Sequence, residues 1–213
     1  MLLFTLSHCK TVPAMAYAER FAARAAAANV TYRPVAVVRS PFRERFGTPR
    51  QPGVTAGAAG GGAAAGEIVF FPGHGYEEAL EDSEGFDMLW VLSHMHLNSS
   101  GWRPKVRPPR LADERKGVFS TRAPHRPNAV ALSAVRVRRV RAADGIVEIE
   151  GGLDLLDGTP VLDVKPYIPY IDSFPDARAG WVDALGSGNE HNLQPDHLST
   201  FSAGAALAYR NKH

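Results

Sequence analysis

The chain of 213 residues is poor in cysteine and has no long apolar run, and each shortage excludes a class of protein. Cys9 is the single cysteine, which excludes an internal disulfide framework and a zinc site built on several thiolates. It also suits a reducing compartment. The longest apolar runs fall far short of the roughly 20 residues that span a bilayer, so we expect no transmembrane helix and no membrane partner.

The sequence also lacks two patterns that hold nucleotide cofactors. Strands and helices do not alternate, so we do not expect a cofactor to be bound by a doubly wound sheet. Residues 54–66 (VTAGAAGGGAAAG) are rich in glycine, but no strand precedes them and no helix clearly follows. They contain too little side chain to pack, and we interpret them as a flexible insertion.

Acidic residues are scarce in one part of the chain. Residues 101–141 contain twelve Lys or Arg and only two acids, Asp113 and Glu114, which gives this segment a net charge of +10. Because the whole chain carries +2, the remainder carries −8. Concentrated positive charge is typical of a protein that binds nucleic acid or another phosphate-bearing partner, although a solvated basic face has the same composition.

Short apolar or alternating segments separated by turn residues predict strands. They fall at residues 35–40, 67–72, 88–95, 134–140, 146–150 and the first part of 161–172. Residues 134–140 (AVRVRRV) and 146–150 (IVEIE) predict a hairpin in which Arg and Glu face one another. We therefore expect a mainly β protein, a small β-barrel with peripheral helices and a short α-helical or irregular C-terminal tail.

This pattern predicts three parts: an N-terminal leader or helix at residues 1–32, a barrel domain at 33–176 and a C-terminal extension at 177–213. The leader is rich in alanine and carries Arg20 and Arg24 with Glu19 as its acid. It fits a helix docked on the domain, and a mitochondrial transit peptide is the alternative. The expected location is the cytoplasm, or the mitochondrion if the leader is such a peptide.

Residues 117–133 (GVFSTRAPHRPNAVALS) place three cations in a short loop rich in turn residues: Arg122, His125 and Arg126. We expect the apolar pair 118–119 and the apolar run 129–132 on either side of the loop to be buried. Prolines on both sides of His125 fix φ and predict a stiff loop. Stiffness and positive charge predict an anion site, and a solvated basic turn remains the alternative.

His94 and His96 alternate at the end of an apolar run, which on a strand would place both on one face, as in a metal pair. No cysteine and no third clustered ligand accompanies them, so we expect no metal. A hydrogen bond from a histidine to a ligand or to the backbone is the preferred interpretation.

Four motifs resemble the TrmO (TsaA-like, YaeB-like) family of tRNA methyltransferases. They are SPFRERFGTPRQPG, GWRPKVRPPRL, GVFSTRAPHRPN and LDLLDGTPVLDVKPYIPYID, in that order. The resemblance covers about two thirds of the chain. It implies a β-barrel enzyme that transfers a methyl group from S-adenosylmethionine to N6 of threonylcarbamoyladenosine, next to the anticodon of tRNA. It also implies a homodimer with the cofactor near the subunit interface.

The resemblance assigns residues to the site. The cofactor would be bound by Pro49, Arg50, Gln51, His96, Leu97, Arg122, Leu132, Asp157, Gly158, Thr159 and Pro160. Arg110, Arg126 and Lys165 would bind the substrate. The family usually has RPNPIG where this chain has RPNAVA, and the glycine-rich insertion replaces a more ordinary loop.

Methyl transfer from a sulfonium is an in-line displacement, so positioning supplies much of the acceleration. The acceptor nitrogen must lose a proton, and Asp163 or Tyr167 could relay it, while Lys165 could hold the threonyl carboxylate.

Two other classes stay open. One is a non-catalytic RNA-binding barrel that grips a strand with its basic segment and binds no cofactor. The other is a small hydrolase with His125 as base and Asp157 or Asp163 as its partner, but no nucleophile elbow or metal set supports it.

Overall fold

The structure is a computed structural model, and it describes residues 29–44, 48, 65–109, 111, 113–150 and 153–185. By its internal contacts the chain divides into two units, 1–33 and 34–213. Most of the leader (1–28), most of the insertion (54–64) and the end of the C-terminal extension (186–213) lie outside the described residues. The predicted domain boundaries therefore stay predictions.

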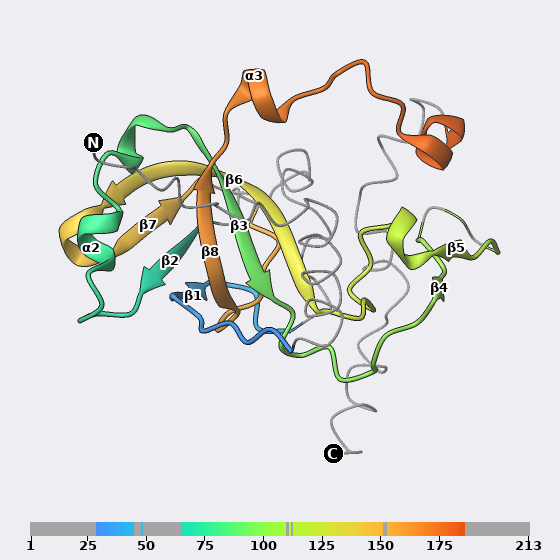
Figure 1. Cartoon of the computed structure of the whole chain (residues 1–213), viewed down its shortest axis with the longest axis horizontal. Helices are drawn as coiled ribbons and strands as arrows, with labels where there is room; N and C mark the ends of the chain where they lie inside the picture. Colours follow the sequence, from blue (N-terminus) through green and yellow to red (C-terminus); the bar gives the residue numbers. More distant parts are fainter. Residues whose placement is uncertain are drawn as a thin grey trace, which may run out of the picture. The chain divides into compact units, whose positions relative to one another are not determined.

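Six strands of the second unit form a closed barrel (Figure 1). Neighbouring strands are antiparallel, in the order β1-β2-β7-β6-β3-β8. Their bounds are β1 Ala36–Arg39, β2 Gly66–Phe70, β3 Met88–His94, β6 Val130–Arg141, β7 Ile146–Ile149 and β8 Pro160–Pro166. The prediction of a mainly β protein with a small barrel is confirmed.

Alternation along the strands fills the interior of the barrel with aliphatic side chains. Residues that face inward are buried and those between them are half-buried or exposed, as in the β3 sequence MLWVLSH. Ile68, Val91, Val135, Val147 and Ile149 are among the most deeply buried, and they belong to four different strands. Burial of a side chain of this size stabilises the fold by about 1.5–3 kcal/mol relative to exposure.

Inward-facing and outward-facing side chains alternate along β6, yet the consecutive residues Arg138 and Arg139 both face outward. A β-bulge explains how the strand accommodates them. The pairing with β7 shifts register between Val137 and Arg139. Before the shift the buried residue is Val135, and after it the buried residue is Val140, so the inward face changes from odd to even numbers. The extra residue keeps both arginines outside the barrel, which is a common use of a bulge.

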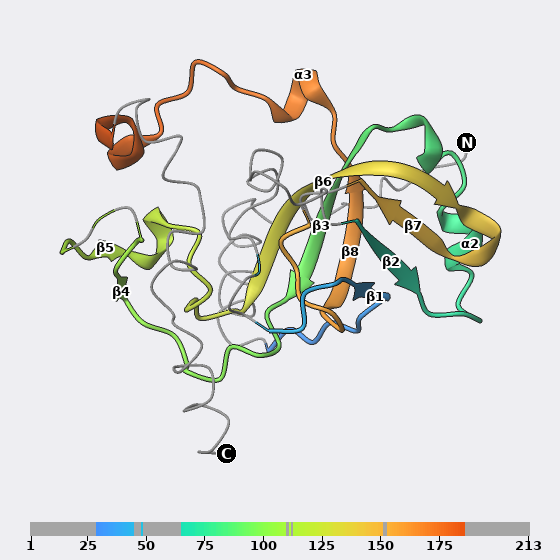
Figure 2. The same ribbon diagram turned by 180° about the vertical axis from the view of Figure 1, so that it is seen from behind.

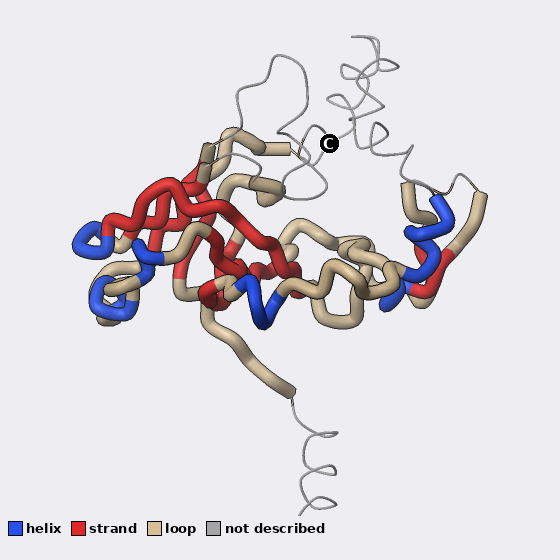
Figure 3. Tube along the Cα trace, turned by 90° about the horizontal axis from the view of Figure 1, so that it is seen from above, coloured by secondary structure: helices blue, strands red, loops and turns tan. Residues whose placement is uncertain are grey.

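The helices are short, some next to the barrel and others away from it (Figure 3). They are α2 Tyr76–Ala79, η2 Ser83–Gly85, η3 Val118–Ser120, η4 Ala142–Asp144, α3 Pro169–Asp172 and η5 Gly180–Leu185. The acidic segment between β2 and β3 contains α2 and η2. In the described part of the chain, no helix is both long and apolar enough to cross a membrane.

A second, two-stranded sheet was not predicted. It pairs β4 Lys105–Val106 with β5 Lys116–Gly117 and lies next to η3 in the chain (Figure 2). The backbone N–H of Val118 extends the pairing by donating to the carbonyl of Pro104, at 3.0 Å. Two-residue strands in a loop rich in proline leave no periodic signal, which is why the sequence did not reveal them.

Candidate functional site

The antiparallel order brings the ends of all six strands together at one end of the barrel. Here β1, β3 and β7 finish, while β2, β6 and β8 begin. We call this end the site end, because the loops that follow or precede these strands carry most of the predicted cofactor residues. Segments far apart in the sequence meet there only through strand pairing.

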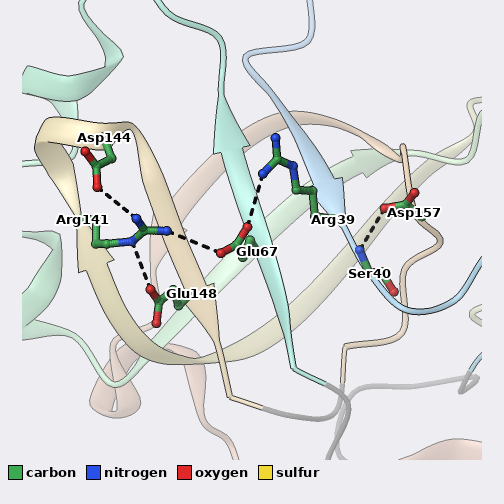
Figure 4. Close-up of polar contacts among 7 residues, drawn as sticks. All are labelled: Arg39, Ser40, Glu67, Arg141, Asp144, Glu148 and Asp157. Carbon is green, nitrogen blue, oxygen red and sulfur yellow. Dashed lines mark hydrogen bonds and ion pairs between the residues drawn. The ribbon is translucent and has the colours of Figure 1, made fainter.

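The turn 157–160 (DGTP) is bonded to the segment that follows β1. Asp157 Oδ1 accepts a hydrogen bond from the backbone N–H of Ser40 at 3.0 Å (Figure 4), and the N–H of Asp157 donates to the carbonyl of Phe42 at 2.7 Å. Gly158 has φ of 76°, a conformation that favours glycine, and its N–H donates to the carbonyl of Val38 at 2.9 Å. The turn therefore has a fixed backbone, and Asp157 Oδ2 has no protein partner among the described residues.

An open depression of about 590 Å³ borders this turn on the outside of the barrel. Its wall includes Arg39, Arg43 and Arg138 together with Glu67 and Asp157. Charges of both signs at one depression suit a ligand that is itself zwitterionic.

The segment after β3 leaves the barrel through a tight turn. The backbone N–H of Met95 donates to the carbonyl of Ala129 at 2.8 Å, and that of His96 donates to the carbonyl of His94 at 2.8 Å. Because β3 ends at His94, the expectation that His94 and His96 alternate along one strand is wrong. His96 and Leu97 lie in the turn, with Leu97 exposed.

The cationic loop is fixed to the segment that follows β3. The side-chain amide of Asn98 donates to the carbonyl of Pro124 at 2.8 Å, and Ser100 Oγ lies 3.0 Å from His125 Nδ1. The backbone N–H of Arg103 donates to the carbonyl of His125 at 3.1 Å. These bonds place the loop beside the site end and give it the stiffness that its prolines predict.

Arg126 and Arg122 have different surroundings in this loop. The Arg126 guanidinium donates to the carbonyls of Val118 at 3.0 Å and Thr121 at 2.8 Å, so it holds the loop together. Arg122 is exposed, and among the described residues no hydrogen bond or ion pair holds its guanidinium. Arg122 is therefore the cation of the loop that is free to bind an anionic ligand.

A half-buried carboxylate that is not among the predicted site residues, that of Asp154, lies near Arg122. Asp154 Oδ1 accepts a hydrogen bond from Ser133 Oγ at 2.8 Å. Burial raises the pKa of Asp154 to about 6, while the bond from Ser133 and the charge of Arg122 oppose the rise. The signal in the sequence was an acid between Leu153 and Leu155, both of which are buried. A carboxyl group with a raised pKa beside a free cation is a common feature of functional sites.

Three predicted site residues, Leu132, Asp163 and Lys165, lie on the outer face of the sheet formed by β6, β3 and β8. Leu132 pairs with Leu92, and Leu92 pairs with Asp163, so the three form a row across the sheet. Asp163 forms an ion pair with Lys165 at 2.9 Å, so the two side chains lie on the same face of β8. The expected burial of residues 129–132 is wrong, because Val130 is 38% and Leu132 57% exposed and the other two are half-buried.

Tyr167 is the predicted residue that lies farthest from the turn. Its ring packs against Trp90, with the ring centroids 5.2 Å apart, and its backbone N–H donates to the carbonyl of Met88. Since a strand rises about 3.3 Å per residue, the length of β8 separates Tyr167 from Pro160 by roughly 20 Å. One subunit therefore does not bring Tyr167 together with the turn.

The remaining predicted site residues, Pro49, Arg50, Gln51 and Arg110, lie outside the described residues.

Part of the positive charge is used within the fold. Arg141 forms ion pairs with Glu148 at 3.0 Å, Asp144 at 3.0 Å and Glu67 at 3.4 Å, and Glu67 also pairs with Arg39 (Figure 4). This confirms the predicted pairing of Arg and Glu across the hairpin. In the described part of residues 101–141, the cations without an ion pair are Arg103, Lys105, Arg107, Arg115, Arg122, Arg126, Arg136, Arg138 and Arg139.

Comparison with known proteins gives a consistent result. The sequence profile described as "tRNA-methyltransferase O N-terminal domain" matches residues 37–173. The chain is 40% identical over 156 residues to the tRNA (adenine(37)-N6)-methyltransferase of Escherichia coli (strain K12), which covers 72% of this chain and 64% of that relative. It is 35% identical over 165 residues to a Pyrococcus abyssi protein named "Probable S-adenosyl-L-methionine-binding protein", covering 78% of this chain and 80% of that one.

A crystal structure of TrmO from Pseudomonas aeruginosa is also similar, with a TM-score of 0.59 and 38% sequence identity. The similarity covers 74% of this chain and 64% of that chain. The chain thus spans a little under two thirds of the length of the first of these relatives and of this solved structure.

Proposed function

The chain belongs to the tRNA-methyltransferase O N-terminal domain family, and on that premise we propose that it is a methyltransferase acting on tRNA. The methyl donor is S-adenosylmethionine, and the acceptor is N6 of threonylcarbamoyladenosine beside the anticodon. The observation that carries the proposal is the meeting of family motifs at the site end. Arg122, the turn at His96 and the bonded turn at Asp157 belong to three separate loops that follow or precede strands at this end.

The residues at the site end fit this donor. Arg122 offers a guanidinium that can bind a carboxylate, such as that of a methionine moiety, with two parallel hydrogen bonds. Asp157 Oδ2 can accept a bond from an amino or hydroxyl group. When bound, the cofactor supplies an electrophilic methyl group on sulfur, and the residues of the chain orient it toward the acceptor nitrogen.

The acceptor nitrogen loses a proton as its bond to carbon forms. We assign the relay of that proton to Asp163 or Tyr167 and the binding of the threonyl carboxylate to Lys165. The ion pair between Asp163 and Lys165 keeps the two side chains on one exposed face, where both are open to a substrate. Because this face lies away from the turn within one subunit, these roles require that a second subunit supply the donor.

A homodimer through the outer face of β6 and β3 meets this requirement. Val130 and Leu132 are 38% and 57% exposed, and β3 places Leu92 and Trp90 beside them on the same face. Adjacent exposed apolar residues of this size mark protein interfaces. The face also contains Leu132, which the family resemblance places near the cofactor.

The methylation assay tests the proposed reaction. Incubation with radiolabelled S-adenosylmethionine is expected to label tRNA that carries threonylcarbamoyladenosine and to leave the same tRNA without that modification unlabelled. Calorimetry with S-adenosylmethionine is expected to show binding in the absence of tRNA. Equal labelling of both tRNAs would refute the assigned acceptor, and an absence of cofactor binding would favour an RNA-binding barrel without catalysis.

Replacement of Leu132 by Glu tests the dimer. A buried, unpaired carboxylate at the interface costs several kcal/mol, so L132E is expected to sediment as a monomer at concentrations where the wild type is a dimer. Because Leu132 is exposed in one subunit, the thermal stability of the monomer should change little. Phe71→Glu, at a partly exposed residue just beyond β2, is the matched control and should remain dimeric. A wild type that is monomeric throughout would refute the dimer.

A further inference from the structure

Phe119 is the residue of the cationic loop whose exposure the proposed reaction does not explain. It lies in η3, where its neighbour Val118 is buried and Phe119 is 75% exposed. A sequence reading expects both members of this apolar pair to be buried, so the structure corrects that expectation for Phe119. Proteins that bind single-stranded nucleic acids combine basic surfaces with exposed aromatic rings on which bases stack.

The ring of Phe119 is backed by a fixed cation. The guanidinium carbon of Arg126 lies 5.4 Å from the ring centroid. Arg126 is held in turn by the carbonyls of Val118 and Thr121, at 3.0 and 2.8 Å. The guanidinium therefore covers one side of the ring, and the exposed fraction of Phe119 belongs to the rest of it.

A small cavity beside the ring has room for one flat group. It measures about 170 Å³ and is lined by Phe119, Arg126, Pro127 and Asn128. The side-chain amide of Asn128 can both donate and accept hydrogen bonds, as recognition of a base edge requires. The cavity thus combines the ring of Phe119 for stacking, the amide of Asn128 for hydrogen bonds to a base edge, and the cation of Arg126.

The charge of the surrounding segment indicates which kind of partner binds beside Phe119. Arg103, Lys105, Arg107, Arg115 and Arg122 have no ion pair among the described residues. A second copy of the chain would bring the same positive charge to this face, which disfavours an interface formed by two identical patches. A polyanion with unpaired bases has the complementary charge.

We propose that Phe119, backed by Arg126, is a stacking platform for an unpaired base of the RNA substrate, with Asn128 at the edge of that base. The inference rests on the proposed function in so far as the substrate is RNA. It adds a contact outside the residues assigned to the methyl donor. It also predicts that RNA with an open loop binds better than a duplex of the same length.

The test compares Phe119→Leu with Phe174→Leu. Both phenylalanines are similarly exposed, at 75% and 73%, but only Phe119 of the two has a cation against its ring. The probe is an anticodon stem-loop RNA with 2-aminopurine in the loop, titrated at constant salt. F119L is expected to weaken loop binding about 5- to 150-fold and to lose the stacking quench of 2-aminopurine, since one stacked base contributes about 1–3 kcal/mol. F174L and binding of duplex RNA should be unchanged.

Other outcomes overturn the platform in distinguishable ways. Unchanged loop binding by F119L, with a wild type that binds, refutes the platform alone. A wild type that binds S-adenosylmethionine but no RNA refutes the proposed substrate as well. Weaker binding of S-adenosylmethionine by F119L in calorimetry would place Phe119 in the donor pocket. Dissociation of the F119L variant into monomers in sedimentation would place Phe119 in a subunit interface.

Discussion

Arg122→Ala is expected to lower methyl transfer roughly 10- to 150-fold, mainly through a higher KM for S-adenosylmethionine. A hydrogen bond to a charged group contributes about 1.5–3 kcal/mol, and each 1.36 kcal/mol corresponds to a factor of ten. Because Arg122 is exposed and no ion pair holds it, the free energy of unfolding should change by less than about 1 kcal/mol. Initial rates at several cofactor concentrations, together with a urea titration, measure both effects.

Two further variants separate a ligand contact from a general loss of charge. Arg115→Ala removes an equally exposed cation of the same basic segment and should leave the KM for the cofactor unchanged. Arg122→Lys keeps the charge but loses the planar fork, so its activity should lie between that of the wild type and R122A. A large loss of stability in R122A would show that the residue is structural and would refute its assignment to the donor site.

Asp154→Asn is expected to stabilise the protein above pH 7 by up to about 3 kcal/mol. The pKa of Asp154 is raised from 3.8 to about 6 by burial, so the folded state binds the proton more tightly than the unfolded chain does. The free energy of unfolding therefore falls as the pH rises from about 4 to about 6, and the stability that is complete below pH 4 is lost above pH 6. A shift of this size corresponds to about 3 kcal/mol at 1.36 kcal/mol per unit.

Asparagine removes this titration and retains an oxygen that can accept the hydrogen bond from Ser133. Urea unfolding of wild type and D154N at pH values from 4 to 8 should give curves that meet near pH 4 and diverge up to pH 6. Asp176→Asn, at an exposed residue beyond α3, is the control and should follow the wild type at each pH. A constant difference between wild type and D154N across this range would contradict the assignment of the raised pKa to Asp154.

A stabilising D154N variant should also be less active. The ionised carboxylate of Asp154 interacts with the charge of Arg122, so the variant changes the electrostatic field at a cation that we assign to the cofactor. Retention of a carboxylate that lowers stability at neutral pH is the pattern expected where function opposes stability.

The barrel could be predicted from the sequence because its strands are short, apolar and separated by turns. The predicted strand at 88–95 is found as Met88–His94, and that at 146–150 as Ile146–Ile149. The apolar run at 129–132 shows the limit of such reasoning. Its members include Val130 and Leu132, which face outward, because composition alone does not distinguish a side chain that packs in the core from one at an interface.

The candidate site was predictable as a set of motifs but not as a geometry. His96, Arg122 and Asp157 come from separate loops, and only the pairing of strands places those loops at one end of the barrel. Asp154 could not be identified from the sequence, because an acidic residue between two leucines is common in turns as well as in cores. Tyr167 and the turn belong to one sequence motif, but the extended strand β8 separates them in space.

The seam between β1 and β8 links the site to the folding of the whole barrel. The two strands pair only through Ala36 with Val161 and Val37 with Pro160, and the turn extends this seam through its bonds to Val38. Closure of the cylinder at this seam therefore also fixes the backbone of the turn, although the two segments come from opposite ends of the barrel sequence. When β1 and β8 are not paired, the turn loses its bonds to the segment after β1. A ligand that binds at the turn therefore binds only the closed barrel and stabilises it against unfolding.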